Sequence, residues 1–357
     1  MGMQTITIIL KALASTGATR STKGIVCIIL DDPNVTGVKT YTALKKVTDN
    51  YSTSNKAVIT RCFSDRGIKT LKVACYNSEN SETIETALKL LSGVKFNYLA
   101  CPTATETDDK LKITQFIKDQ RKNNNMIVKA VLNNYPGDYE GIINFINNQI
   151  TLSDSTVLTG AEFTVDFACL CATVSLTSSL TNAIVDGIKA VDSVGDDLDT
   201  LVNEGKVFLF YDNDLESIVI SRAVNSKTTI GSNEKESLKK IRVVEILDMI
   251  RDDIKVTFKT TYQGKIANTL ANKKLLVSAI NVYLRSMAKQ GALNTGETNE
   301  VSLDVDSQKE YLEDKGIDVT DLTEDEILAK DTGENVFITG TIYVVDAMED
   351  LQLILSY

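Results

Sequence analysis

Residue types that carry chemistry are sparse in this chain, and the most closely spaced of them are two cysteines. Cys169 and Cys171 are separated by one residue, so on a β-strand their thiols would share a face. A structural zinc ion needs four ligands, and the sequence offers no second cysteine pair to complete the set. We therefore interpret both thiols as small apolar side chains of a core.

Two segments match the Ser-x-x-Lys spacing that pairs a nucleophile with its base in some acyl enzymes. They are Ser237–Lys240 and Ser286–Lys289. Residues three apart share a face of a helix, so each lysine would lie beside its serine. The companion motifs of those enzymes are missing, and the lysines are expected on solvated helix faces. We interpret both segments as ordinary surface structure.

The chain contains no histidine, which removes whole classes of mechanism. His-dependent triads, imidazole general bases and histidine metal ligands are excluded. There is no Walker-type glycine loop, and no GxGxxG motif follows a predicted strand. An acidic run does not fit the spacing of an EF-hand loop, and we interpret it as a solvated junction; it holds Asp192, Asp196, Asp197 and Asp199. The sequence therefore predicts no cofactor and no bound metal.

Charge and hydropathy narrow the choice of partners. The 357 residues carry a net charge of −10, which repels phosphate backbones, so nucleic acid is not expected as a partner. No stretch approaches the roughly 20 apolar residues that cross a bilayer, so no membrane insertion is expected. Residues 1–10 carry no basic residue and do not resemble a secretory signal. The unpaired cysteines are typical of a reducing cytosol.

Secondary-structure elements must position the residues named above, and between residues 24 and 177 strands alternate with helices. Near-continuous apolar strands are predicted at 25–30, 71–76, 96–101, 126–132 and 165–176. Helices are predicted at 54–66, 81–92, 106–122 and 139–150. This alternation is typical of an α/β domain whose mostly parallel sheet is covered on both faces. The small polar residues 12–23 before it are predicted to form a flexible arm.

Residues 178–335 have an α+β pattern. A broken helix is predicted at 178–201, and a hairpin pairs 207–211 with 218–220. Apolar residues then recur at helical spacing over 243–254 and 266–287, which predicts two long helices. Residues 304–330 are acidic and partly helical.

Both ends of the chain alternate with the period of a half-buried strand, and residues 336–357 are predicted to complete or extend the core sheet. Leu351, Leu353 and Leu355 begin a last short strand. A lone strand is unstable, so these strands either fold into their own domain or join the sheet of a neighbouring copy. The residues predicted to link subunits are Thr5, Ile6, Thr7, Ile8, Ile9, Leu10, Phe337, Ile338, Thr339, Ile342, Tyr343 and Val344.

The C-terminal half resembles a known family, the contractile tail sheath proteins. The closest likeness is to sheaths of phage-like particles and R-type bacteriocins from low-GC Gram-positive bacteria. The segments that carry the resemblance are 222–226, 239–254, 262–268, 272–274, 283–284 and 291–293. It covers about 206–357 and the first strand, whereas residues 24–176 match only in size and position.

The resemblance implies a fold and an assembly. An α/β outer domain (24–177) would be inserted between an N-terminal strand and arm (1–23) and an α+β sheath core domain (178–335) with strand-exchanging termini. Copies would stack as hexameric rings around a tail tube and contract to drive it through a bacterial envelope. The implied partners are further copies of the chain, the tube, and baseplate and tail terminator proteins. Assembly would occur in the bacterial host cytoplasm, before the chain becomes part of a phage tail or bacteriocin particle.

Charged residues are predicted to help join the copies. The acidic stretch 310–334 is most simply an exposed surface, and in an assembly it would face a basic patch of another copy. The candidates for this core interface are Lys239, Lys240, Arg242, Lys273, Lys274, Glu324, Asp325 and Glu326.

Two alternatives to a sheath remain at this point. An α/β enzyme or small-molecule-binding protein would place its site at the carboxyl ends of the strands, where Asp31, Asp32 and Thr103 are candidates, although Asp31-Asp32-Pro33 is also ordinary turn chemistry. A tail tube or shell protein is the other alternative, but the two long predicted helices argue against the mostly β tube proteins.

Overall fold

The computed structural model describes residues 24–355 except 176, 196 and 233. These residues divide into two compact units, which we call the sheet unit (24–248 with 347–355) and the helical unit (249–346). The division falls within α7 (Ile241–Thr257). Residues 178–248, which the sequence analysis assigned to the core domain, therefore pack with the sheet unit. The predicted strand at residues 5–10 and the arm lie outside the described residues.

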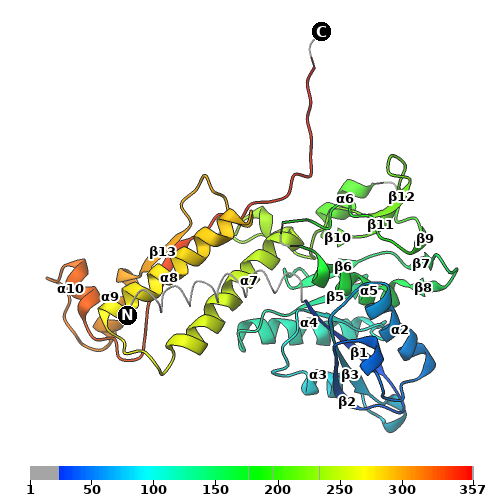
Figure 1. The fold of residues 1–357 in the computed structure, drawn as a ribbon, viewed down its shortest axis with the longest axis horizontal. Helices are drawn as coiled ribbons and strands as arrows, with labels where there is room; N and C mark the ends of the chain where they lie inside the picture. Colours follow the sequence, from blue (N-terminus) through cyan, green and yellow to red (C-terminus); the bar gives the residue numbers. More distant parts are fainter. Residues whose placement is uncertain (1–23, 176, 196, 233, 356–357) are drawn as a thin grey trace. The chain divides into compact units, whose positions relative to one another are not determined.

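The sheet unit is built on a seven-stranded sheet of order β10-β6-β5-β4-β1-β3-β2 (Figure 1). Its strands are β1 (Ile25–Asp31), β2 (Gly37–Tyr41), β3 (Thr70–Tyr76), β4 (Tyr98–Ala100), β5 (Lys129–Asn133), β6 (Ile142–Phe145) and β10 (Lys206–Val207). All neighbours pair in parallel except β2, which runs antiparallel to β3. The predicted, mostly parallel α/β sheet is confirmed for this unit.

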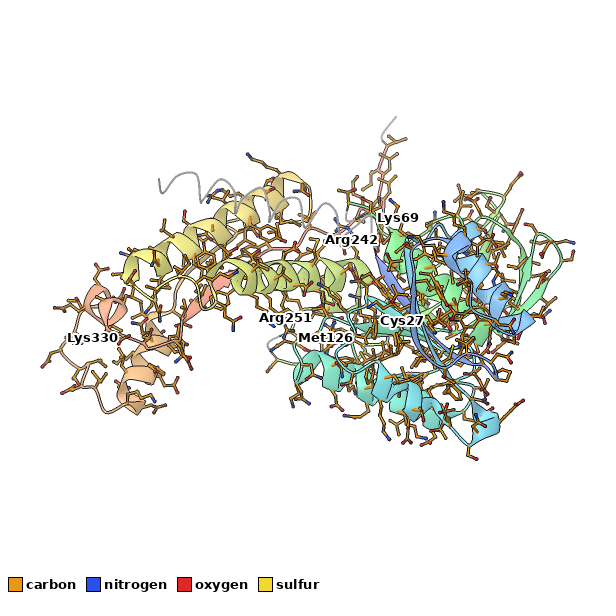
Figure 2. All side chains as sticks on the ribbon, turned by 60° about the horizontal axis from the view of Figure 1, so that its bottom comes forward. Cys27, Lys69, Met126, Arg242, Arg251 and Lys330 are labelled. Atoms are coloured by element: carbon orange, nitrogen blue, oxygen red, sulfur yellow. The ribbon has the colours of Figure 1, made fainter. Side chains whose placement is uncertain are left out.

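Helices cover both faces of this sheet, and β1 shows how the sequence directs them. Val26, Ile28 and Leu30 point to one face, where α2 (Thr53–Ser64) and α5 (Gly160–Thr173) pack. Cys27 (labelled in Figure 2) and Ile29 point to the other face, where α3 (Ile84–Leu90) and α4 (Thr107–Lys122) pack. Both faces are apolar because both are buried.

Two predicted elements between residues 139 and 176 are wrong. The predicted helix at 139–150 is instead strand β6 followed by β7 (Gln149–Leu152). The predicted strand at 165–176 lies mostly in helix α5. Short apolar runs do not distinguish a buried strand from a buried helix, and most of α5 is apolar because nearly every side of it is buried.

The rest of the sheet unit is a set of small antiparallel pairs. The predicted broken helix at 178–201 is also wrong, since that stretch holds β9 (Ile188–Val191) and only the start of α6 (Leu198–Asn203). β9 and β8 (Val157–Thr159) flank β7. The predicted hairpin is confirmed as β11 (Leu209–Asp212) and β12 (Ser217–Ile220). One-turn helices occur at Leu44–Lys46, Ser78–Asn80 and Glu236–Lys239.

The helical unit contains the second of the two predicted long helices. α7 ends in a π-helical turn, Phe258–Tyr262, and α8 (Leu270–Lys289) follows. The buried face of α8 carries residues at helical spacing: Leu276, Ile280, Tyr283, Leu284 and Met287. α8 packs against β13 (Glu300–Leu303), which pairs antiparallel with β14 (Ile338–Thr341).

Between β13 and β14 the chain forms a small helical module with its own core. It consists of α9 (Val305–Asp314) and α10 (Glu324–Ala329). Leu312, Val319 and Ile327 are buried together within it. Thr323 and Glu326 start α10 with a reciprocal capping box.

Candidate assembly surfaces

The candidate catalytic residues lie at the carboxyl ends of the strands, where their side chains hold turns and loops in place. Asp32 is fully buried, and its carboxylate accepts hydrogen bonds from the backbone of Asn34, Val35 and Ser52 and from Asn55. Burial alone would raise its pKa, but these hydrogen bonds lower it. Asp31 accepts from Ser78, and Thr103 lies against Tyr76 and Cys101. These carboxylates therefore brace loops at the carboxyl ends of β1 and β3.

The cysteine pair, the Ser-x-x-Lys segments and the acidic run also have contacts that give them structural roles. Cys169 and Cys171 are buried on α5, a helix and not a strand as predicted. Lys240 pairs with Glu349 at 3.1 Å, and Ser286 accepts a hydrogen bond from Gln290. In the acidic run, Asp192 accepts from Asn147 and Asn148, whereas Asp197 caps α6; Asp196 is not described. No group of acidic or cysteine side chains among the described residues has the arrangement of a metal site.

The described part of the chain has no helix that is both long enough and apolar enough to span a bilayer.

The C-terminal segment is held to the sheet unit at one point, which we call the Glu349 clamp. The Glu349 side chain is only 5% exposed. Its carboxylate accepts hydrogen bonds from Ser179 (3.1 Å), Thr181 (2.7 Å) and Lys240 (3.1 Å), and Arg222 lies 3.8 Å away. Arg222 also pairs with the next residue, Asp350. Sequence patterns cannot reveal the role of Glu349, because all its partners lie more than 100 residues away in the chain.

Beyond the clamp the chain runs on without helix or strand, as an extended trace (Figure 1). The short strand predicted at residues 351–355 is therefore not formed in the single chain. Its apolar side chains are 67–88% exposed. They belong to Leu351, Leu353, Ile354 and Leu355. We call residues 351–355 the apolar tail; a contiguous exposed apolar stretch of this kind marks an interaction site.

The C-terminal residues predicted to link subunits have an intramolecular partner. Ile338 and Thr339 pair with Leu303 and Ser302 of β13, and Val344 forms a bridge with Leu293. Phe337 packs on Tyr311, with ring centroids 5.4 Å apart. Ile342 and Tyr343 continue this docked stretch, and the Tyr343 N–H donates to Asn299. In a single chain these residues complete their own sheet, whereas the apolar tail is left exposed.

The two outer edges of the β13–β14 pair differ. On β13, the N–H and C=O of Val301 are both bonded by the Asn281 side chain, at 2.7 and 2.9 Å. In an antiparallel pair every second residue turns its backbone groups outward. On β14 the outward positions are Ile338 and Gly340, and in the described part of the chain nothing pairs with this edge. The β14 edge is therefore open and the β13 edge is largely closed.

The small helical module is the most acidic surface of the chain. Residues 304–334 contain 12 Asp or Glu residues and three Lys, a net charge of −9 against −10 for the whole chain. Glu324, Asp325 and Glu326 are exposed at the start of α10. Lys330, one of the three lysines, is labelled in Figure 2. Negative side chains at a helix N-terminus also stabilise the helix dipole.

The predicted basic patch does not form one free surface. Lys239 pairs with Glu236, and Lys240 belongs to the Glu349 clamp. Arg242 is buried, and so is Lys273, whose amine donates to Thr332 at 2.9 Å. Lys274 alone among these five residues is exposed. Four of the five residues are thus paired or buried, which the sequence alone could not show.

A second feature that sequence patterns cannot reveal is a buried ionic cluster, formed by Arg121, Lys129, Glu245 and Asp248. Both terminal nitrogens of Arg121 donate hydrogen bonds to the Asp248 carboxylate, at 2.7 and 2.9 Å. Lys129 bonds Asp248 at 2.9 Å and Glu245 at 2.7 Å, and Tyr98 donates to Glu245. Burial alone would raise the pKa of Asp248, but the charges of Lys129 and Arg121 lower it to about 2. The cluster ties the first turns of α7 to the seven-stranded sheet.

Comparison with known proteins matches this chain to sheaths over nearly its whole length. Residues 78–226 match the phage tail sheath protein central domain, and residues 233–354 match the phage tail sheath C-terminal domain. The tail sheath protein of Clostridium phage phiCD119 is 34% identical over 361 residues, covering 99% of this chain and 98% of that protein.

Solved structures share the fold. A sheath tail protein from Desulfitobacterium hafniense superposes with a TM-score of 0.73 at 18% identity, covering 92% of this chain and 94% of that one. The helical sheath of the anti-feeding prophage in its contracted state gives 0.68 at 15% identity, covering 95% and 94%. The fold is thus that of subunits of contractile sheaths. The chain belongs to the phage tail sheath family, and it is a tail sheath protein of a contractile injection system.

Proposed function

We propose that copies of this chain are joined into a sheath by strand exchange, in which the apolar tail of one copy pairs with the open β14 edge of the next. The observation that carries this proposal is the coexistence of a clamped, exposed apolar tail with a sheet that has one unpaired edge. An extended peptide adds to such an edge through backbone hydrogen bonds, and its alternate side chains find pockets. Residues 5–10 are proposed to act in the same way at a second joint.

The free energy expected from one exchanged strand favours a sheath held together by many weak joints over one held by a single strong joint. A lent strand makes about five backbone hydrogen bonds worth roughly 1 kcal/mol each, and each buried leucine adds about 2 kcal/mol. Ordering the segment costs roughly 1–2 kcal/mol per residue. A single joint is therefore only moderately stable, but several joints per copy act together through avidity. Such a lattice keeps its connections while the subunits rearrange.

We assign contraction to this rearrangement and not to a catalytic step. A sheath that contracts by improving burial and charge pairing between copies needs no nucleotide, and the sequence has no phosphate-binding loop. The carboxylates at the sheet edge, which the enzyme alternative required, already serve as turn braces. The sheet unit then acts as the outer domain, and the helical unit acts as the core.

The remaining partners follow from this arrangement. We propose that the sheath forms hexameric rings around a tail tube, with a baseplate at one end and a terminator protein at the other. It would assemble in the host cytoplasm and then remain in the phage tail or bacteriocin particle. The acidic module 304–334 is proposed to face the tube, because the predicted basic patch on other copies is mostly occupied.

Truncation tests the strand exchange directly. A chain that ends at Asp346 should remain a folded monomer by circular dichroism and should form no tubes in negative-stain images. A chain lacking residues 1–12 should behave in the same way if the second joint exists. A triple variant that keeps the tail length but makes it polar, L351N/L353N/L355N, separates loss of apolar contacts from loss of chain. Long tubes formed by the chain ending at Asp346 would overturn the proposal for that end.

A further inference from the structure

The helical unit contains a cavity that the strand-exchange proposal leaves unused. It measures about 650 Å³ and lies where the π-helical turn leads into α8. Its apolar lining comes from Phe258, Tyr262, Ile266, Leu276 and Val336. A volume in this range accommodates a few side chains or a small ligand.

One buried acceptor in the wall of this cavity has no donor. Asn268 lines the cavity, and its amide nitrogen donates to Thr332, Gly333 and Asn335. Those three acceptors fix the orientation of the amide, because a flipped group would set oxygen against oxygen. Its Oδ1 is buried and lacks a hydrogen-bond partner in the described structure. A buried acceptor without a donor costs free energy, so a rearrangement of this wall that gives the Asn268 Oδ1 a donor is favoured.

The cavity adjoins the edge where the tail is proposed to pair. Val336 lines it, and the open edge of β14 begins two residues later at Ile338. A strand advances about 3.3 Å per residue, so five tail residues that pair along Ile338–Gly340 have about two residues left to reach Val336. The apolar tail brings leucine and isoleucine side chains that match the apolar part of the lining.

We propose that this cavity receives the end of the apolar tail, residues 354 and 355, from a second copy of the chain. The inference rests on the proposed strand exchange and names the socket in which the exchanged strand ends. The side chains of Ile354 and Leu355 are 79–80% exposed in the structure, so they are available to a second copy. A shift of the Asn268 side chain as the tail enters would bring its Oδ1 to a backbone N–H of the tail.

Disulfide trapping tests the socket in the full-length chain. The six native cysteines are buried, so an engineered pair is the accessible one. Ile266 sits at the cavity rim and is 44% exposed, and Leu275 on α8 is 43% exposed but does not line the cavity. Assembled I266C/L355C should give a ladder of linked chains on a non-reducing gel, whereas L275C/L355C should give monomer. Tubes of I266C/L355C without a ladder, or a ladder from the control pair, would overturn the socket.

A charge placed at the rim gives an independent readout. I266E should leave the monomer folded and raise the protein concentration needed for tube formation by roughly tenfold, since it opposes burial of the tail's end. Normal assembly of I266E would overturn the socket even if removal of residues 347–357 abolishes assembly, so the two proposals fail separately. A ladder from I266C/I8C with none from I266C/L355C would also overturn it, by assigning the cavity to the N-terminal segment.

Discussion

At the scale of single residues, the sheet unit depends on a buried carboxylate with two cationic partners. Asp248 accepts from both Arg121 and Lys129, and its side chain is 5% exposed. Removing one partner of a buried ion pair leaves the other charges without compensation, which costs much more than the pair contributes. The cluster therefore constrains which substitutions α7 tolerates at its start.

Substituting Asp248 should destabilise the sheet unit strongly. D248N keeps the size of the side chain but leaves Arg121 and Lys129 facing a neutral amide, so we expect a loss of about 3 kcal/mol in the free energy of unfolding. Urea denaturation followed by circular dichroism measures it. D108N removes an exposed carboxylate that pairs with Lys112 on α4, and it should have little effect. Equal midpoints for D248N and the parent chain would contradict this account.

Glu349 acts at the same scale but on the tail. E349A removes the acceptor shared by Ser179, Thr181 and Lys240, so the start of the tail should detach from the sheet unit. Hydrogen exchange measured by mass spectrometry should become roughly tenfold faster over residues 345–351 and around Thr181. D350N keeps the clamp and loses only an exposed ion pair with Arg222, so its exchange should match that of the parent chain. Unchanged exchange in E349A would show that the clamp does not hold the tail.

At the scale of elements, the two hydrogen-bonding edges of β14 have different roles. Its inward groups pair with β13, and its outward groups at Ile338 and Gly340 are available to a neighbour. The backbone N–H at an outward position can therefore be removed without breaking the chain's own sheet.

Proline at an outward position should stop assembly and leave the monomer intact. I338P deletes one donor of the open β14 edge, and I338A is its matched control because it shortens the side chain but keeps the N–H. We expect I338P to abolish tube formation in negative-stain images, whereas I338A should reduce it only modestly. Both monomers should show far-UV spectra like that of the parent chain. Full-length tubes from I338P would mean that the tail pairs elsewhere.

The sequence predicted elements well where periodicity was long, and poorly where burial was complete. Helices α4 and α8 have enough turns for their apolar stripes to be unambiguous. Helix α5 reads as a strand because its buried residues are continuous, although the Thr159–Glu162 capping box was a local signal for a helix start. Strand β6 is only four residues long, too short for any period to emerge.

The assembly surfaces were likewise only partly predictable from the sequence. The exposed acidic residues of α10 and the alternation of the tail could be read from the sequence. The Glu349 clamp, the ionic cluster at Asp248 and the closure of the β13 edge by Asn281 could not, because each joins residues that are distant in the chain or depends on which face of an element is buried. The domain boundary was misplaced for the same reason, since β10 joins the sheet from beyond residue 177.

At the scale of the whole molecule, charge is separated along the chain. Residues 304–334 carry a net charge of −9 within 31 residues, whereas the remaining residues together sum to −1. Such a concentrated charge steers association with a positive surface and is screened by salt. The sheet unit, which is proposed to face outward, carries a net charge of −7, but that charge is spread over more than 200 residues.

Reversing charge on α10 should therefore weaken binding to the tail tube more than it weakens sheath folding. E324K/D325K changes the module's net charge from −9 to about −5, so co-sedimentation with purified tube protein at low salt should fall severalfold and depend less on salt. E85K/D108K makes the same change in charge at exposed positions of the sheet unit and is the control. Equal losses for the two variants would point to net charge alone, whereas a loss confined to E324K/D325K identifies the acidic module as the surface that meets the tube.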